Sequence, residues 1–85
     1  MTTYAIEFVS SVKKDLRKLE RKDQTRILAT IRKLSDDPRP AASKSLKGAK
    51  ERRLRVGNFR VIYDIYEDKL VVLVIKIAHR REVYR

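Results

Sequence analysis

The chain has 85 residues, and its 22 lysines and arginines against 11 acids give a net charge of +11 at neutral pH. It has no cysteine and one histidine, which excludes disulfides, cysteine-based zinc sites and metal sites built from several histidines. We expect a single cytoplasmic domain over residues 1–85, because the chain shows neither a signal-peptide pattern nor an apolar run long enough to span a membrane. The charge predicts a polyanionic or acidic partner, and no membrane partner is expected.

The first half of the chain predicts one strand and two helices. Residues 3–9 are rich in β-branched and aromatic side chains, which is typical of a strand. Apolar residues spaced three and four apart then predict a helix capped by Ser10 or Ser11 and a second helix capped by Asp23. The prolines of "DDPRP" end the second helix, because the residue before a proline is pushed away from helical angles. Residues 41–50 are expected to form a basic loop.

The second half of the chain alternates with a period of two, which predicts three strands. They cover residues 52–56, 59–66 and 70–80. Gly57-Asn58 suits a two-residue type II′ turn, and residues 67–69 fit a three-residue connection. The expected fold is α+β with the order β-α-α-β-β-β, a helical hairpin packed on one face of a mainly antiparallel four-stranded sheet.

Basic residues are concentrated in the predicted loop and in the β-hairpin that follows it: residues 44–60 carry seven of them against one acid. Side chains alternate between the two faces of a strand, so residues next to core positions face away from the helices. By this rule Arg55 pairs with Arg60 on the open face, and a three-residue turn then pairs Arg60 with Lys76. The basic residues expected on this face are Arg53, Arg55, Arg60, Lys76 and Arg80.

Such a face is costly for the sheet by itself. Directly opposed like charges cost some fraction of about 1 kcal/mol per pair, and Asp64 is the one acid of matching parity on the second strand of the hairpin. A bound polyanion would offset the repulsion, and the planar guanidinium group matches phosphate oxygens. Arg52 has the opposite parity and is expected at the rim of the sheet.

Three stretches give the chain a resemblance to a known family: "LKG" at 46–48, "RLRVGNFRVIYDI" at 53–65 and "HRREVYR" at 79–85. The chain resembles the RelE toxins of the RelE/ParE superfamily of toxin–antitoxin modules. The middle stretch is shared across the superfamily, and the last is more typical of RelE-type nucleases. The resemblance implies a ribosome-dependent endoribonuclease that cuts mRNA in the A site without a metal or other cofactor.

The resemblance also implies roles for individual residues. Arg60 matches the second-strand arginine of the family, Arg80 the arginine that ends the last strand, and Tyr84 the C-terminal tyrosine. Arg53 stands at a basic position, whereas Glu51 stands where the family often has a further lysine. The expected catalytic residues are therefore Arg53, Arg60, Arg80 and Tyr84. The other basic residues expected to bind RNA phosphates are Lys44, Lys47, Lys50, Arg55, Lys76 and Arg81.

In the implied reaction, the ribose 2′-OH attacks the adjacent phosphate and leaves a 2′,3′-cyclic phosphate and a free 5′-OH. Tyr84 is the expected base; the ordinary tyrosine pKa near 10 is too high, and nearby arginines should favour the phenolate. Arg60 and Arg53 are expected to clamp the phosphate, and Arg80 to neutralise the phosphorane. The acid is unassigned, because the parity of His79 places it on the helix side, where a structural role is expected.

Two other functions stay open at this point. The ParE branch shares the fold but inhibits DNA gyrase and has no nuclease site. A non-catalytic module that binds RNA or the ribosome would also use a basic face. Either toxin reading implies an antitoxin, expected to be RelB-like, with an acidic amphipathic helix that covers the basic face or packs along the helices.

Overall fold

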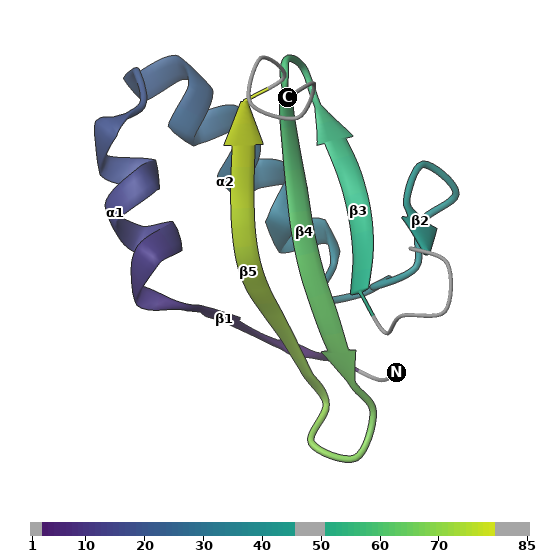
Figure 1. Cartoon of the computed structure of the whole chain (residues 1–85). Helices are drawn as coiled ribbons and strands as arrows, with labels where there is room; N and C mark the ends of the chain where they lie inside the picture. Colours follow the sequence, from purple (N-terminus) through teal and green to yellow (C-terminus); the bar gives the residue numbers. More distant parts are fainter. Residues whose placement is uncertain (1–2, 46–50, 80–85) are drawn as a thin grey trace.

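The computed structural model describes residues 3–45 and 51–79. The two helices pack against one face of a mixed sheet (Figure 1), so the predicted α+β class is confirmed. The elements in chain order are β1 (Ala5–Phe8), α1 (Ser10–Lys18), α2 (Arg21–Lys33), β2 (Lys44–Ser45), β3 (Glu51–Val56), β4 (Phe59–Tyr66) and β5 (Val71–His79). Neither helix in this part of the chain is long and apolar enough to cross a membrane.

The sheet has five strands in the order β1-β5-β4-β3-β2. β1 runs parallel to β5, and the other neighbouring strands are antiparallel. The sequence predicts four strands, and this count is wrong. The additional strand is β2, which has two residues and lies in the segment expected to be a loop. The helical hairpin carries the chain from β1 at one edge to β2 at the other, and the last three strands then return across the sheet to β1.

The predicted apolar stripes of the helices face the sheet. Val12 of α1 and Ile27 and Ile31 of α2 are fully buried in the core beside Tyr63 of β4. This core lies between the helices and the sheet, so neither helix of the described part of the chain covers the opposite face of the sheet (Figure 1).

The predicted helix caps are wrong. Ser10 is already the first residue of α1, and Asp23 lies in the first turn of α2; the capping positions are Val9 and Glu20, and neither side chain caps its helix. α1 begins this early because the Val9 N–H donates to the carbonyl oxygen of Val74 at 3.1 Å, so the sheet holds the residue before the helix. A tertiary contact therefore replaces the local cap that the sequence predicts.

The β3–β4 hairpin has the predicted register. Arg55 lies opposite Arg60 across the Gly57-Asn58 turn. Gly57 has a φ of +59°, and Asn58 is not among the residues with positive φ, which fits the predicted type II′ turn. Arg53 and Arg55 therefore share a face with Arg60.

The β4–β5 hairpin differs from the predicted register by one residue. Its connection has four residues, 67–70, because Leu70 adopts the left-handed conformation with a φ of +53°. Arg60 consequently lies opposite Ala78, and the predicted pairing of Arg60 with Lys76 is wrong.

A β-bulge then restores the alternation of faces. Tyr63 pairs with Val74 and Ile62 pairs with Lys76, so β5 carries one extra residue, Ile75, at this point. Val72 and Val74 before the bulge face the core, and so does Ile77 after it. Without the extra residue, Lys76 would point into the core; with it, the Lys76 side chain is exposed on the open face.

Candidate nucleic-acid interface

Four basic residues from three strands line one groove on the open face of the sheet. The register brings them together, because Lys44 of β2 lies opposite Arg53 of β3, and Arg55 lies opposite Arg60 of β4. With Ala42 they enclose a groove of about 330 Å³. The groove gathers, in one place, four of the side chains that the sequence predicts to bind or cleave RNA.

The groove carries positive charge that no described acid offsets. Across residues 3–45 and 51–79, the two ion pairs join Arg39 to Glu67 and Lys22 to Glu20, and both lie elsewhere. Arg53 and Arg60 are half-buried on the strands, so their guanidinium groups start from a rigid base. A cluster of like charges held in place this way is suited to an anion with several oxygen atoms.

The remaining predicted site residues divide into two groups. Lys76 lies in the same row as Arg53, with Ile62 between them, and so belongs to the open face beyond the groove. The others lie outside the described residues, and their roles stay predictions. They are Lys47, Lys50, Arg80, Arg81 and Tyr84.

Acidic residues occupy the next row of the open face. Asp64 of β4 lies opposite Glu51 of β3 on one side and opposite Leu73 of β5 on the other. Leu73 in turn pairs with Glu7 of β1, so the row crosses four strands. The Asp64 Oδ1 atom is buried and has no hydrogen-bond partner among the described residues. This row is two residues along the strands from the Arg53 row, or about 7 Å. The open face is therefore basic at the end of the β3–β4 turn and acidic at the other end.

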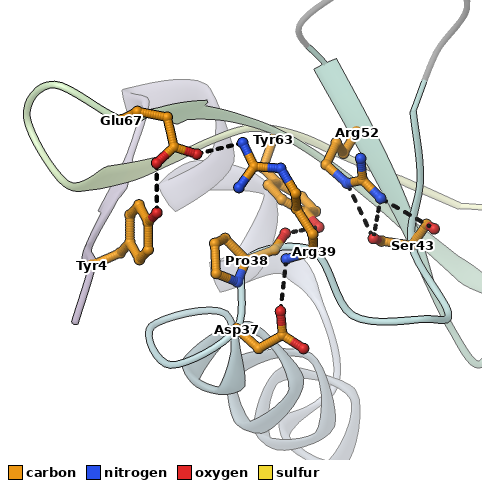
Figure 2. A network of polar contacts seen from close by, with 8 residues as sticks. All are labelled: Tyr4, Asp37, Pro38, Arg39, Ser43, Arg52, Tyr63 and Glu67. Carbon is orange, nitrogen blue, oxygen red and sulfur yellow. Dashed lines mark hydrogen bonds and ion pairs between the residues drawn. The ribbon is translucent and has the colours of Figure 1, made fainter. Parts of the chain in front are cut away.

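Arg52 holds the loop that leads into the groove. The Arg52 guanidinium donates to the Ser43 Oγ atom at 2.9 and 3.1 Å (Figure 2). The buried Ser43 hydroxyl in turn donates to the carbonyl oxygen of Pro40. Arg52, which the sequence predicts at the rim of the sheet, is thus half-buried and hydrogen-bonded to the loop before β2. These bonds fix the chain next to Lys44, one of the groove residues.

Tyr63 anchors the same loop from the core. Its ring is fully buried, and its hydroxyl donates to the carbonyl oxygen of Pro38 at 2.8 Å (Figure 2). Strand parity puts Tyr63 on the same face as the buried Val61, and a buried tyrosine hydroxyl usually finds a partner. The identity of that partner could not be inferred, because Pro38 is 25 residues away in the sequence.

Glu67 joins three segments at the acidic end of the sheet. It accepts a hydrogen bond from the Tyr4 hydroxyl at 2.7 Å, and its second carboxylate oxygen pairs with the Arg39 guanidinium (Figure 2). The hydrogen bonds from Tyr4 and Arg39 lower the pKa of Glu67 below its ordinary value, and the bond to Glu67 raises the pKa of Tyr4. The cluster connects the start of β1, the loop after α2 and the β4–β5 turn.

His79 lies on the helix side of β5, as its parity predicts. Its ring meets the Phe59 ring edge to face, with 5.0 Å between centroids. Both rings line a small groove with Leu19 and Lys18 at the end of α1. This position lies across the sheet from the cationic groove, which agrees with a structural role.

Comparison with known proteins gives consistent matches over nearly the whole chain. A family model for the ParE toxin of the type II toxin–antitoxin system parDE matches residues 6–84. A putative toxin RelE1 from Methanocaldococcus jannaschii is 31% identical, and the match covers 96% of each chain. The solved RelE–RelB complex of Pyrococcus horikoshii contains a chain that is 28% identical with a TM-score of 0.83, and the match covers 94% of this chain and 97% of that one.

A second solved structure, the RelBE2 toxin–antitoxin complex of Mycobacterium tuberculosis, gives a TM-score of 0.83 at 25% identity and covers 94% of both chains. The helical hairpin, the five-stranded sheet and these matches define the chain as a toxin of a type II toxin–antitoxin system. It belongs to the RelE/ParE toxin family and is a toxin of the RelBE type.

Proposed function

We propose that this toxin is a ribosome-dependent endonuclease that cuts mRNA in the A site. The observation that supports the proposal is the groove in which Lys44, Arg53, Arg55 and Arg60 converge without a described acidic partner. A phosphodiester gains a second negative charge as it becomes a phosphorane. Fixed guanidinium groups stabilise that added charge more than they stabilise the ground state, which is the requirement for catalysis.

In the proposed reaction the ribose O2′ atom forms a bond to phosphorus while the bond from phosphorus to O5′ breaks. The departing O5′ atom takes up a proton, so the products are a 2′,3′-cyclic phosphate and a free 5′-OH. Arg60 and Arg53 hold the phosphate oxygens in the groove. Tyr84 removes the 2′-OH proton and Arg80 neutralises the phosphorane, both as the family resemblance implies. The ribosome orients the mRNA, so weak activity on free RNA is expected, and no step in the scheme requires a metal.

The proposed partner in the resting state is a RelB-like antitoxin. The solved relatives include RelE–RelB complexes, and a chain with a net charge of +11 favours an acidic partner. We expect an acidic amphipathic helix that either covers the basic face or packs along the helices.

Cleavage of mRNA on purified ribosomes tests the proposal. The wild-type toxin should cut at the A-site codon, and Arg60→Gln should lower the cleavage rate about 100-fold, because it removes one donor to the phosphorane. Arg32→Gln is the matched control, since it removes an exposed arginine from α2. Cleavage by Arg60→Gln at the wild-type rate would contradict the proposed role of the groove.

The ParE name of the matching family model supports a second candidate function, inhibition of DNA gyrase. A supercoiling assay run beside the ribosome assay separates the two functions. Gyrase inhibition with intact mRNA would favour the ParE branch. Tyr84→Phe separates an enzyme from a non-catalytic binder, because the enzyme should lose cleavage and still bind the ribosome.

A further inference from the structure

The hairpin turn between β3 and β4 lies between a pair of arginines on one side and a single arginine on the other. Arg55 and Arg60 form the strand pair next to this turn on the open face. On the other side, the Arg26 side chain of α2 lies against the turn: a Cβ atom at Gly57 would be only 2.9 Å from the Arg26 Nη1 atom. The missing side chain at Gly57 therefore leaves room for a third guanidinium group at the tip.

Arg26 has the same free positive charge as the groove residues. Its side chain is exposed and makes no hydrogen bond or ion pair with the described part of the chain. Its backbone carbonyl oxygen does accept a bond from the Thr30 hydroxyl, which is a contact within the helix. The basic surface thus continues from the groove, over the turn, to α2.

The opposite direction along the sheet is closed to a phosphate backbone. Glu51 and Asp64 lie opposite each other in the row below Arg53, and Glu7 extends that row on β1. An anionic strand that ran down the sheet from the groove would meet these carboxylates. Along the strands, charge therefore favours the path toward the turn over the path down the sheet.

We propose that bound RNA leaves the groove over the β3–β4 turn, and that Arg26 binds an RNA phosphate on this path. The inference rests on the proposed function for the identity of the ligand. It adds to the groove a residue that strand parity could not identify, because Arg26 comes from a helix on the other side of the sheet. It also gives Gly57 a second role besides its backbone conformation.

The test measures how the affinity for RNA depends on salt. The probe is a single-stranded RNA with 2′-O-methyl groups, which binds but cannot be cut, and the full-length toxin is titrated between about 50 and 200 mM salt. Each phosphate contact to a single strand contributes about −0.7 to the slope of log K against log salt. Arg26→Gln should make the slope shallower by about that amount, and Arg26→Lys should keep the wild-type slope.

Arg32→Gln, on the same helix, should also keep the wild-type slope. If Arg26→Gln and Arg32→Gln change the slope equally, Arg26 has no special role and the inference is overturned. Arg60→Gln tests the groove separately: if its slope equals that of the wild type, the proposed function fails. A shallower slope for Arg60→Gln with an unchanged slope for Arg26→Gln would overturn only the path over the turn.

Glu51→Gln provides a measurement that does not depend on how well an Arg26 variant folds. If RNA leaves over the turn, removing this carboxylate should not add a phosphate contact, so the slope should stay the same. Tighter binding with a steeper slope would mean that RNA runs down the sheet instead, because the variant would then have removed a carboxylate that repels the phosphates, contrary to the inference.

Discussion

At the scale of single residues, two buried or bridging hydroxyl groups hold together segments that are distant in sequence. Tyr4 reaches Glu67 in the β4–β5 turn, and Tyr63 reaches Pro38 in the loop after α2. Neither contact lies in the cationic groove. Tyr63 holds the loop that leads to Lys44 directly, and Tyr4 acts on it through Glu67, which also binds Arg39 of that loop. Both contacts contribute to the site by fixing the chain that carries one of its residues.

Glu67 should make stability depend on pH in the acid range. Hydrogen bonds from Tyr4 and Arg39 lower the pKa of Glu67 in the folded state. The ionised carboxylate therefore stabilises the fold fully above the unfolded-state pKa of about 4.3, and this stabilisation is lost as the pH falls through the folded-state pKa. We expect the Tm of the wild type to fall more steeply with acid than that of Glu67→Gln. Thermal unfolding from neutral to acid pH measures this difference.

The control for Glu67 is Asp68→Asn, which changes the neighbouring carboxylate in the same turn. Asp68 makes no hydrogen bond or ion pair within residues 3–45 and 51–79, so this variant should keep the wild-type pH dependence. If the Tm of Glu67→Gln and that of the wild type fall equally with acid, the Tyr4–Glu67–Arg39 cluster does not contribute to the pH dependence of stability.

Tyr63→Phe should destabilise the fold without changing the shape of the core. It removes the bond to Pro38 and leaves a backbone carbonyl oxygen without that partner, which typically costs about 1–3 kcal/mol for a buried group. Urea unfolding measures the change in free energy. An unchanged free energy would mean that water or another group replaces the tyrosine hydroxyl at no cost.

At the scale of the elements, the two β-hairpins use the left-handed backbone conformation in opposite ways. Gly57 occupies it in the β3–β4 turn, where glycine has no steric cost, and Leu70 occupies it in the β4–β5 turn, where a side chain is strained. The Leu70 side chain is also 42% exposed, so burial does not compensate for this strain. Because the β4–β5 turn is one residue longer than predicted, the bulge at Ile75 is needed to keep the core residues of β5 on the helix side.

Substitutions at these two turns should therefore have opposite effects. Gly57→Ala should lower the free energy of unfolding by about 1–2 kcal/mol, because alanine is strained at this φ and its Cβ atom would meet Arg26. Leu70→Asn should raise it by about 0.5 kcal/mol, because asparagine tolerates this conformation. Chemical denaturation of both variants checks the pair, and a loss of stability in Leu70→Asn would refute the strain at Leu70.

At the scale of the whole molecule, self-repulsion follows from the net charge of +11. The described part of the chain has two ion pairs, both between exposed side chains. Because few charges attract and many repel, added salt screens more repulsion between like charges than attraction within ion pairs. The open face concentrates that repulsion in the groove and on the turn. A bound RNA or acidic antitoxin would remove it, which is why the proposed partners are polyanionic.

The Tm of the isolated toxin should rise as sodium chloride is added from about 0.01 to 0.15 M, the range over which the screening length falls from about 30 to 8 Å. Differential scanning calorimetry measures this shift, and chloride is used because sulfate could bind the arginines specifically. A Tm that falls with salt would mean that attractive pairs dominate, contrary to the charge pattern described above.

Local patterns in the sequence were sufficient for the order of the elements apart from β2 and for one face of the sheet. Helical spacing placed Val12, Ile27 and Ile31 in the core, and Gly57-Asn58 set the register of the β3–β4 hairpin. Both signals depend on residues close together in the chain. They were therefore enough to predict that Arg53, Arg55 and Arg60 share a face. The catalytic roles of Arg53 and Arg60 and the phosphate-binding role of Arg55 stay predictions.

The tertiary structure decided the features that depend on distant contacts. The bulge at Ile75 keeps Lys76 exposed although the strand is shifted by one residue, and β2 forms only because β3 offers it a partner. Arg26 meets Gly57, and Glu67 meets Tyr4, across gaps in sequence that no local pattern spans. The sequence by itself determined which side chains are basic and which way they alternate; packing between the helices and the sheet decided where that basic surface begins and ends.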